Sequence, residues 1–286
     1  MSSDALSLRA PHRLLVEPIV RHALEEDLGR AGDLTSDIII PEEQTGKAKL
    51  VTRSSGVIAG LICAECAFRL IDPNIRMEGV FRDGARVSQR DILATVAGSA
   101  RSLLSAERVA INFLGHLSGV ATATRELVDA VAGTKARIVC TRKTTPGLRI
   151  LEKYAVRCGG GFNHRFGLDD AVLIKDNHIA AASGITHAVE RVRRSLGHMA
   201  AIEVEVDTLE QLEEALSLEI RTILLDNMTS EELKSAVQRA QGRAVLEASG
   251  GVTLATVRAI AETGVDYISS GAITHSAQSL DVALDF

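Results

Sequence analysis

Hydrophobic and polar positions follow two different patterns along the chain, and the pattern changes near residue 105. Before that point, short segments such as residues 83–87 and 90–93 alternate apolar and polar residues around turn formers. Such alternation is typical of antiparallel strands with one buried face. An acidic, helical pattern over residues 16–29 precedes them. We therefore expect a helix and a small β-sandwich in a first domain, residues 1–115.

A long segment with helical periodicity follows the predicted strands. It runs from Ser105, which is a suitable N-cap, to Gly133, which is a suitable C-terminal stop. Its length predicts either one long helix or two consecutive helices that join the two halves of the chain.

Strands and helices alternate after Gly133. Strand patterns cover residues 136–141, 171–175, 201–206, 222–226, 244–249 and 266–271. Helical patterns lie between them, and one begins with the capping box of Thr229 and Glu232 while the last stops at Gly264. This alternation predicts an α/β fold with a parallel sheet covered by helices. Six strands suit an α/β barrel, complete or incomplete, over residues 116–274.

Composition and charge exclude several classes of protein. Hydrophobic residues make up 46% of the 286 residues and charged residues 24%, which fits a folded chain with a large core. A net charge of -5 and an aromatic content of 3% argue against a nucleic-acid partner. The sequence lacks a membrane-length apolar run and a signal-peptide core, so we expect a cytoplasmic protein without a membrane partner. It also lacks the glycine-rich motifs of dinucleotide and P-loop sites.

The spacing of Cys63 and Cys66 forms a CxxC, which is half of a possible zinc site. Cys140 and Cys158 are far apart and do not supply the second half. The segment around the CxxC has a helical pattern, and we expect both thiols to pack in a core.

Each predicted strand of the second half is followed by polar, charged or small residues. In chain order these are Thr141-Arg142-Lys143, Lys175-Asp176-Asn177-His178, Glu205-Val206-Asp207, Asp226-Asn227, Ser249-Gly250-Gly251 and Ser270-Gly271-Ala272. The carboxyl ends of parallel strands lie at one edge of a sheet, where α/β barrels form their active sites. The sequence therefore predicts one site built from all six strand ends.

The predicted site residues divide into three chemical groups. The cations Arg142, Lys143 and Lys175, with His164 and Arg165 in a glycine-rich loop, suit a ligand with several negative charges. The carboxylates Glu205 and Asp226 require a divalent cation or sugar hydroxyls between themselves and an anion. The serine–glycine segments after the last two strands offer free backbone N–H groups for a phosphate.

Each of these residues also has a structural interpretation. Lys175 suits a solvated strand end, Glu205 and Asp226 suit pairing with nearby bases, and single histidines such as His164 and His178 are more often structural. The run of glycines at residues 159–161 suits a flexible loop. The convergence of all these groups on one edge favours the functional interpretation.

Long ordered motifs resemble the quinolinate phosphoribosyltransferase family. They lie at residues 105–122, 141–149, 152–178, 202–211, 223–228, 247–252 and 264–276. The resemblance extends from about Leu14 to the C-terminus. It implies an N-terminal α/β sandwich, an open α/β barrel of the type II phosphoribosyltransferases, and a C-terminal tail, residues 275–286, that packs back on the first domain.

The resemblance also implies an activity and a homodimer with shared sites, which can assemble further. The expected reaction transfers phosphoribosyl from phosphoribosyl pyrophosphate to quinolinate, with decarboxylation, to give nicotinate mononucleotide for NAD biosynthesis. Arg108 of one subunit is expected in the site of its partner.

Residue roles follow from the same resemblance. Arg142, His164, Arg165 and Lys175 are expected to hold the two carboxylates of quinolinate, with Thr141 and Asn112 as further contributors. Lys143, Glu205 and Asp226 are expected at the ribose, the pyrophosphate and Mg²⁺, with the two carboxylates binding the metal directly or through water. The 5′-phosphate is expected at Ser249, Gly250, Gly251, Ser270, Gly271 and Ala272, and the catalytic set is Lys143, Lys175, Glu205 and Asp226.

Three other functions are compatible with the same sequence. A related pyrophosphorylase-like protein of metal-transport operons shares the fold and differs in substrate. A Schiff-base aldolase would use Lys175 as its nucleophile. A sugar-phosphate binder without catalysis would keep its function after loss of Glu205.

Overall fold

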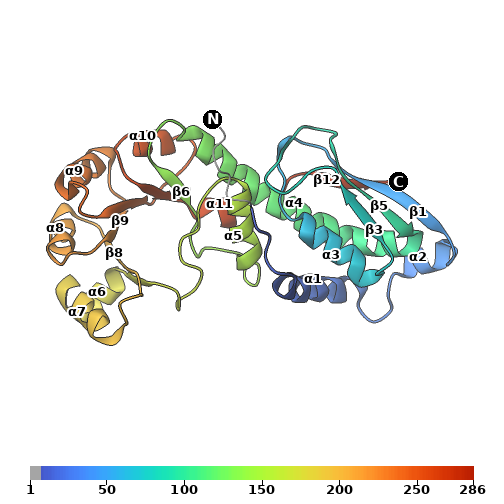
Figure 1. Cartoon of the computed structure of the whole chain (residues 1–286), viewed down its shortest axis with the longest axis horizontal. Coiled ribbons are helices and arrows are strands. Elements are labelled where there is room, and N and C mark those ends of the chain that lie inside the picture. The colour runs from blue at the N-terminus through green and yellow to red at the C-terminus, as the bar shows by residue number, and fades with distance from the viewer. Residues whose placement is uncertain (1–7) are drawn as a thin grey trace. The chain divides into compact units, whose positions relative to one another are not determined.

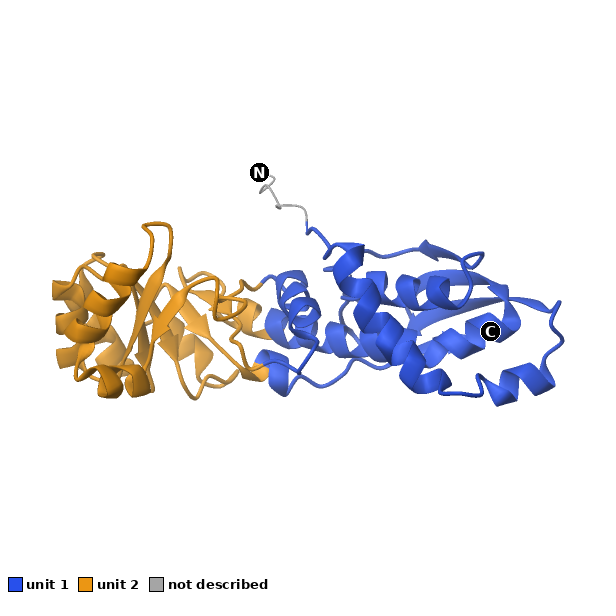
Figure 2. Cartoon of the chain, turned by 90° about the horizontal axis from the view of Figure 1, so that it is seen from below, with its two compact units in different colours: residues 1–125, 144–160, 273–286 blue, residues 126–143, 161–272 orange. Residues whose placement is uncertain are grey.

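The computed structural model describes residues 8–286 and forms two compact units (Figures 1 and 2). Unit 1 contains the described residues up to 125 together with residues 144–160 and 273–286. Unit 2 contains residues 126–143 and 161–272. Each unit is therefore assembled from segments that are separated in the sequence.

An antiparallel sheet forms the centre of unit 1. Its strands are β1 (Thr45–Thr52), β3 (Arg76–Gly79), β5 (Ile92–Ser99) and β12 (Val282–Asp285), in the order β12-β1-β5-β3. A separate pair joins β2 (Gly56–Val57) to β4 (Arg86–Val87). Alternate residues of β1, at 48, 50 and 52, are buried, as in a strand with one buried face. The C-terminal strand β12 lies at one edge and pairs with β1.

One continuous helix, α4 (Ala100–Ala130), follows β5. It begins before Ser105, so the prediction that Ser105 caps this helix is wrong. Residues 100–104, with the sequence ARSLL, contain good helix formers and no breaker, and the helix extends back through them. The Ser105 hydroxyl instead donates a hydrogen bond to Oδ2 of Asp33, at 3.0 Å. Gly133 lies in the turn after the helix with a φ of 82°.

The other helices of unit 1 pack around this sheet and α4. They are α1 (Arg13–Leu28), α2 (Leu34–Ile39), α3 (Leu61–Ile71) and α5 (Arg149–Cys158), while the short α11 (Ala272–His275) enters the unit from residue 273. Asp83 joins two of these helices. It accepts a hydrogen bond from the Tyr154 hydroxyl of α5 at 2.9 Å and one from each backbone N–H of Gly60 and Leu61, both at 3.1 Å. Asp83 thus fixes α5 against the start of α3.

The thiols of the CxxC motif lie in α3. Cys63 and Cys66 are both buried and unbridged, as the structural interpretation predicted. Burial raises the pKa of both thiols, which disfavours the thiolate that zinc requires. Within residues 8–286, neither thiol belongs to a cluster of possible metal ligands.

Unit 2 contains a six-stranded parallel sheet, as predicted. Its strands are β6 (Arg137–Val139), β7 (Val172–Ile174), β8 (Ile202–Val206), β9 (Thr222–Asp226), β10 (Val245–Ser249) and β11 (Tyr267–Ser269), and its helices are α6 (Asp176–Ala182), α7 (Ile185–Ser195), α8 (Leu209–Ser217), α9 (Ser230–Ala240) and α10 (Val257–Ala261). The strand order is β6-β11-β10-β9-β8-β7, so β6 and β7 form the two edges of an open barrel. Among the described residues, no helix is both long enough and apolar enough to span a bilayer.

Helix α4 packs closely on the C-terminal segment within unit 1. The backbone N–H of Leu280 donates to the Gly115 carbonyl at 2.9 Å. A Cβ atom added at Gly119 would collide with the carbonyl oxygen of Gln278. These two glycines therefore allow the chain that leads to β12 to lie against the helix.

We predict that Gly119→Ala lowers the free energy of unfolding. The collision involves backbone atoms that cannot rotate away, and overpacking of this kind costs about 1–3 kcal/mol, whereas the better helix propensity of alanine offsets at most about 1 kcal/mol. Gly197→Ala is the control, because a Cβ at Gly197 meets no atom within 4 Å. Urea denaturation of both variants measures the difference. A Gly119→Ala protein as stable as the wild type would contradict the close packing.

Candidate active site

A cavity of about 370 Å³ lies at the carboxyl ends of the strands of unit 2. It is lined by Thr141, Arg142, Lys143, His164, Arg165, Leu173, Lys175, Glu205, Leu224, Asp226, Glu247, Ser249 and Ser269. Residues from all six strand ends, and from the loop between β6 and β7, therefore meet in one place. The convergence that the strand pattern predicted is present within unit 2.

Four cationic side chains line this cavity. Arg142 and Lys143 follow β6, Arg165 lies in the loop before β7, and Lys175 follows β7. Nη1 of Arg165 donates to the Ala171 carbonyl at 2.9 Å, whereas its Nε is buried and makes no hydrogen bond to a described residue. The positive charges of these four side chains suit the cavity to an anion.

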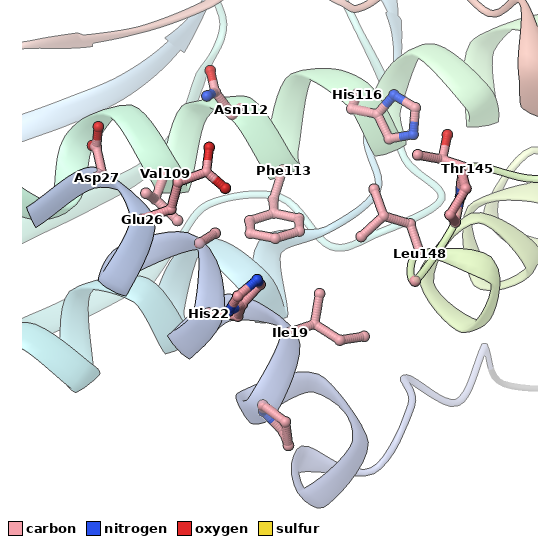
Figure 3. Close-up of a pocket in the computed structure, with 14 residues that line it drawn as sticks. Ile19, His22, Glu26, Asp27, Val109, Asn112, Phe113, His116, Thr145 and Leu148 are labelled. Carbon is pink, nitrogen blue, oxygen red and sulfur yellow. The ribbon is translucent and has the colours of Figure 1, made fainter. Parts of the chain in front are cut away.

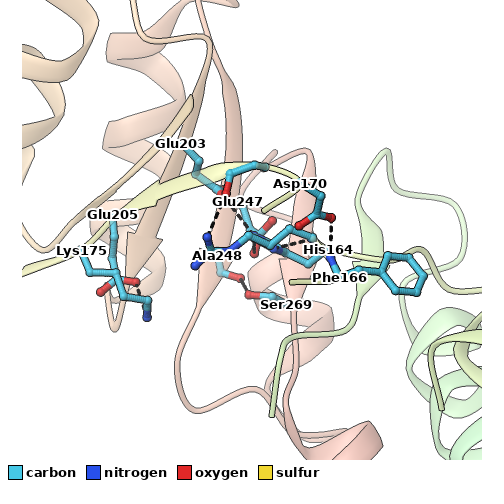
Figure 4. Close-up of polar contacts among 11 residues, drawn as sticks. His164, Phe166, Asp170, Lys175, Glu203, Glu205, Glu247, Ala248 and Ser269 are labelled. Atoms are coloured by element: carbon cyan, nitrogen blue, oxygen red, sulfur yellow. Dashed lines mark hydrogen bonds and ion pairs between the residues drawn. The ribbon is translucent and has the colours of Figure 1, made fainter. Parts of the chain in front are cut away.

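Lys175 and Glu205, which both line the cavity, form an ion pair (Figure 4). Nζ of Lys175 lies 3.1 Å from Oε2 of Glu205, and the two side chains are 47% and 12% exposed. Burial raises the pKa of Glu205, the Lys175 ammonium opposes that rise, and the negative charges of Asp226 and Asp176 add to it. Burial thus disfavours the charged form of Glu205 in spite of its ion pair with Lys175.

Asp226 ends β9 and is held by its neighbour. The Asn227 side-chain amide donates to Oδ2 of Asp226 at 2.7 Å, and Asn227 itself adopts a left-handed conformation with a φ of 53°. The next strand brings Gly250 against Asn227, so closely that a Cβ at Gly250 would collide with Oδ1 of Asn227. Gly250 is therefore required for the positions of Asn227 and Asp226.

His164 lies on a buried pair of carboxylates (Figure 4). Its Nε2 is 2.8 Å from Oε2 of Glu203 in β8 and 3.8 Å from Oε1 of Glu247 in β10. Nδ1 of the same ring accepts a hydrogen bond from the backbone N–H of Arg165 at 2.8 Å. Burial and the negative charge of Glu203 raise the pKa of Glu247, while His164 lowers it. His164 thus connects the floor of the cavity to the backbone of the loop that carries Arg165.

The serine–glycine segments differ in what their backbones offer. Gly250 and Gly251 have φ values of 91° and 60°, which turn the chain after β10. After β11, however, the Ser270 N–H donates to the Val139 carbonyl at 3.0 Å. The expectation that this N–H is free for a phosphate is therefore wrong, because parallel pairing with β6 continues one residue beyond the strand.

Arg108 and Asn112 belong to unit 1 and do not line the strand-end cavity. Both are exposed on α4. Asn112 lines a second pocket of about 670 Å³ between α1, α4 and residues 145–148 (Figure 3). One wall of that pocket is fixed by the fully buried Glu152, which contacts His116 at 2.8 Å and accepts from the Thr145 N–H at 3.1 Å.

Sequence reasoning missed Glu203, Glu247 and Ser269 at this site. The signal for Glu203 was present in the pattern of β8, residues 202–206. Two glutamates alternate there with two fully buried valines. A strand that is covered on both faces normally consists of apolar residues only. Charged residues inside such a strand are costly unless they have partners, so their presence points to a site.

Comparison with known families and proteins gives one consistent result. The chain matches the model of the quinolinate phosphoribosyl transferase N-terminal domain over residues 33–118 and that of the C-terminal domain over residues 120–285. It is 45% identical over 277 residues to a probable nicotinate-nucleotide pyrophosphorylase [carboxylating] of Synechocystis, with 96% of the chain and 93% of the relative covered. It is 42% identical over 287 residues to a mitochondrial quinolinate phosphoribosyltransferase [decarboxylating] of Nicotiana tabacum, with 94% and 81% covered.

Solved structures agree with this result. The crystal structure of the nicotinate-nucleotide pyrophosphorylase from Ehrlichia chaffeensis matches with a TM-score of 0.90 and 45% identity, covering 94% of this chain and 97% of that chain. The crystal structure of NadC from Streptococcus pyogenes matches with a TM-score of 0.94 and 38% identity, covering 97% and 98%.

We predict that Glu205→Gln stabilises the folded protein at neutral pH. The raised pKa of Glu205 means that folding favours its protonated form, so the ionised carboxylate lowers stability above the folded pKa. Glutamine removes that charge, and Lys175 remains partly hydrated at 47% exposure. The expected gain is on the order of 1 kcal/mol, or about 2–4 °C in Tm.

The gain should shrink as the pH falls from the raised pKa of Glu205 in the folded protein to the ordinary pKa of glutamate, because the folded wild type is then protonated as well. Calorimetric melting at a series of pH values measures it. Glu190→Gln is the control, since Glu190 forms an exposed pair with Arg194. A Glu205→Gln protein less stable than the wild type at neutral pH would show that Glu205 serves the fold.

Proposed function

The chain belongs to the quinolinate phosphoribosyltransferase family, and on that premise we propose that it converts quinolinate and phosphoribosyl pyrophosphate to nicotinate mononucleotide, CO₂ and pyrophosphate. The names of the relatives describe this reaction from opposite directions, as carboxylating or decarboxylating. The single observation that carries the proposal is the cavity of unit 2, where four cations and separate carboxylates meet at the strand ends. This set of charges suits a dicarboxylate beside a sugar pyrophosphate.

The cationic residues are proposed to hold quinolinate. Arg142, Arg165 and Lys175 would contact its two carboxylates, while His164, whose two ring nitrogens contact Glu203 and the Arg165 N–H, would act on them through Arg165. Contacts to both carboxylates would fix the orientation of the pyridine ring. Thr141 borders the same space.

The other residues of the cavity are proposed to hold phosphoribosyl pyrophosphate. Lys143, Glu205 and Asp226 would engage the pyrophosphate and the ribose hydroxyls, whereas the segments after β10 and β11 would surround the 5′-phosphate. The backbone at Gly250 and Gly251, with its positive φ angles, allows a close approach of the phosphate.

Two bonds to carbon break and two form during the proposed reaction. The bond from the ribose C1 to pyrophosphate breaks, and the quinolinate nitrogen bonds to C1 to give a pyridinium. The bond from C2 of the ring to its carboxylate then breaks, the ring accepts the electron pair as CO₂ leaves, and a proton replaces the carboxylate. Positive charge develops on the ribose in the first step, and the carboxylates of Glu205 and Asp226 would stabilise it.

The acidic pair fits a divalent cation. Burial and the neighbouring charge of Asp226 raise the pKa of Glu205, so a cation between the two carboxylates would offset a cost that the protein alone leaves. We propose that Glu205 and Asp226 hold Mg²⁺, directly or through water. When bound, Mg²⁺ supplies charge neutralisation for the departing pyrophosphate.

The environment of Lys175 favours this reaction over a Schiff-base mechanism. Lysines that act as Schiff-base nucleophiles are desolvated or lie beside another cation. Lys175 is 47% exposed and lies 3.1 Å from Glu205. An anion contact suits it better than nucleophilic attack.

We further propose a homodimer in which Arg108 of one subunit enters the cavity of its partner. Arg108 is exposed on α4 and does not line the cavity of unit 2. The family resemblance implies that Arg108 contacts quinolinate, although Arg108 belongs to unit 1 and the cavity belongs to unit 2. A contribution of Arg108 to the site of the partner subunit is consistent with both points. Assembly beyond the dimer and the cytoplasmic location remain predictions.

The proposed reaction predicts strict selection of the dicarboxylate. Nicotinate would leave the cations intended for the second carboxylate without an anion, and sites of this kind reject such analogues by roughly 10⁴-fold. The assay supplies phosphoribosyl pyrophosphate and Mg²⁺ with each pyridine, and it measures CO₂, mononucleotide and kcat/KM. Phthalate, which lacks the ring nitrogen, should bind and inhibit.

Comparable turnover of nicotinate and quinolinate would contradict the selection of a dicarboxylate. Absence of product from quinolinate, in a folded protein with Mg²⁺, would contradict the proposed function itself.

The shared site predicts complementation between inactive variants. Arg108→Ala and Lys143→Ala homodimers should each be nearly inactive, because each lacks one part of every site. After subunit exchange, about half of the dimers are hybrids with one intact site, so about a quarter of wild-type activity should return. A mixture of Lys143→Ala with Lys175→Met is the matched control and should stay inactive, because both changes affect the same cavity. Hybrids that form but remain inactive would exclude the shared site.

A further inference from the structure

Glu203 has no role in the proposed substrate contacts, yet it is buried beneath them. It is 7% exposed, and its neighbour Glu247 is 5% exposed. Each of them has one oxygen, Oε1, that makes no hydrogen bond to a described residue. Replacing buried charges by apolar residues is often neutral or stabilising, so stability alone does not account for this pair.

The contacts of His164 define where the ring carries its proton. The Arg165 N–H donates to Nδ1 at 2.8 Å, and Nδ1 therefore presents a lone pair. Nε2 then carries the hydrogen, which it donates to Oε2 of Glu203 at 2.8 Å. The imidazole is thus fixed at both nitrogens, with Glu203 on one side and the backbone of Arg165 on the other.

We propose that Glu203 is a positioning residue for quinolinate, acting through His164 on Arg165. By accepting the Nε2 hydrogen, Glu203 selects the tautomer whose Nδ1 can hold the Arg165 N–H. That contact fixes the backbone from which the Arg165 guanidinium reaches the cavity, and Nη1 is fixed in turn by the Ala171 carbonyl. The role of Arg165 rests on the proposed function, whereas the tautomer of His164 does not.

A metal ion is the competing explanation of the same cluster. The ligand atoms of His164, Glu203 and Glu247 lie within 4.8 Å of one another. A metal at Nε2 requires that nitrogen without hydrogen. The hydrogen bond at Nδ1 places the hydrogen on Nε2, so the geometry favours a hydrogen-bonded ring over a coordinated one.

Paired substitutions at Glu203 separate these explanations. Glutamine retains an oxygen acceptor for Nε2, while leucine has a similar size and no acceptor. We expect Glu203→Leu to raise the KM for quinolinate about tenfold, the scale of one lost hydrogen bond to a charged group, and to leave the KM for phosphoribosyl pyrophosphate unchanged. Glu203→Gln should restore the KM for quinolinate to near the wild-type value.

Nitrogen NMR of the histidine rings tests the tautomer without any assay of activity. The signals of His164 are assigned by their loss in His164→Asn. We expect the Nε2–H form in the wild type and in Glu203→Gln, and a mixture of tautomers in Glu203→Leu. This measurement separates a failure of the tautomer assignment from a failure of the proposed function. The Nε2–H form in a protein that does not convert quinolinate would overturn the proposed function and leave the tautomer assignment standing.

Three outcomes would overturn the proposal. The first is a wild-type His164 that lacks the Nε2–H form. The second is an unchanged KM for quinolinate in a folded Glu203→Leu protein. The third is a Glu203→Gln protein as impaired as Glu203→Leu, which would assign the effect to charge or to a metal. Elemental analysis then compares the Glu205→Gln protein with the double variant that also carries Glu203→Gln. An ion that is present in the first protein and lost in the second is bound through Glu203.

Discussion

The common direction of six parallel strands in unit 2 is the constraint on which the candidate site depends. Because all six strands end at one edge, residues as far apart in the sequence as Thr141 and Ser269 line a single cavity. Hydrogen bonds between neighbouring strands hold each end in register, as in the pairing of Ser249 with Asp226. The strands supply rigid positions, and the short segments after them supply the chemistry.

The cavity concentrates charges that the fold alone would not favour. Glu203 and Glu247 are buried inside the sheet, Glu205 has a raised pKa, and the buried Nε of Arg165 makes no hydrogen bond to a described residue. Each feature costs free energy in the unliganded protein. Within the protein, Glu203 is held by Nε2 of His164, and Lys175 partly offsets the charge of Glu205. Such costs are characteristic of sites that are organised before the ligand arrives.

Unit 1 depends on a different constraint, because two later segments of the chain must pack against its first segment. The segment of residues 144–160 and the C-terminal segment both fold with the first 125 residues. Asp83 fixes the first of these segments through Tyr154, and Gly115 and Gly119 admit the second against α4. The pairing of β12 with β1 then completes the sheet. Backbone contacts of this closeness require glycine, since any side chain would separate the two segments.

Local patterns in the sequence determined the strands and helices, the α/β class and most of the cationic and acidic groups at the strand ends. These features were predictable because strand and helix periodicities are local, and because parallel strands carry their functional groups at one end. Periodicity did not determine where α4 begins, since the helix-forming residues before Ser105 look like the end of the preceding strand.

Tertiary structure alone decided which distant groups meet. It brought Glu203 and Glu247 from separate strands to His164, engaged the Ser270 N–H with Val139, and joined β12 to β1. No single segment specifies these contacts, because each depends on the pairing and packing of segments that are far apart in the chain. The sequence thus determined the chemistry available at the strand ends, and packing decided which of those groups are held by the protein itself and which face the cavity.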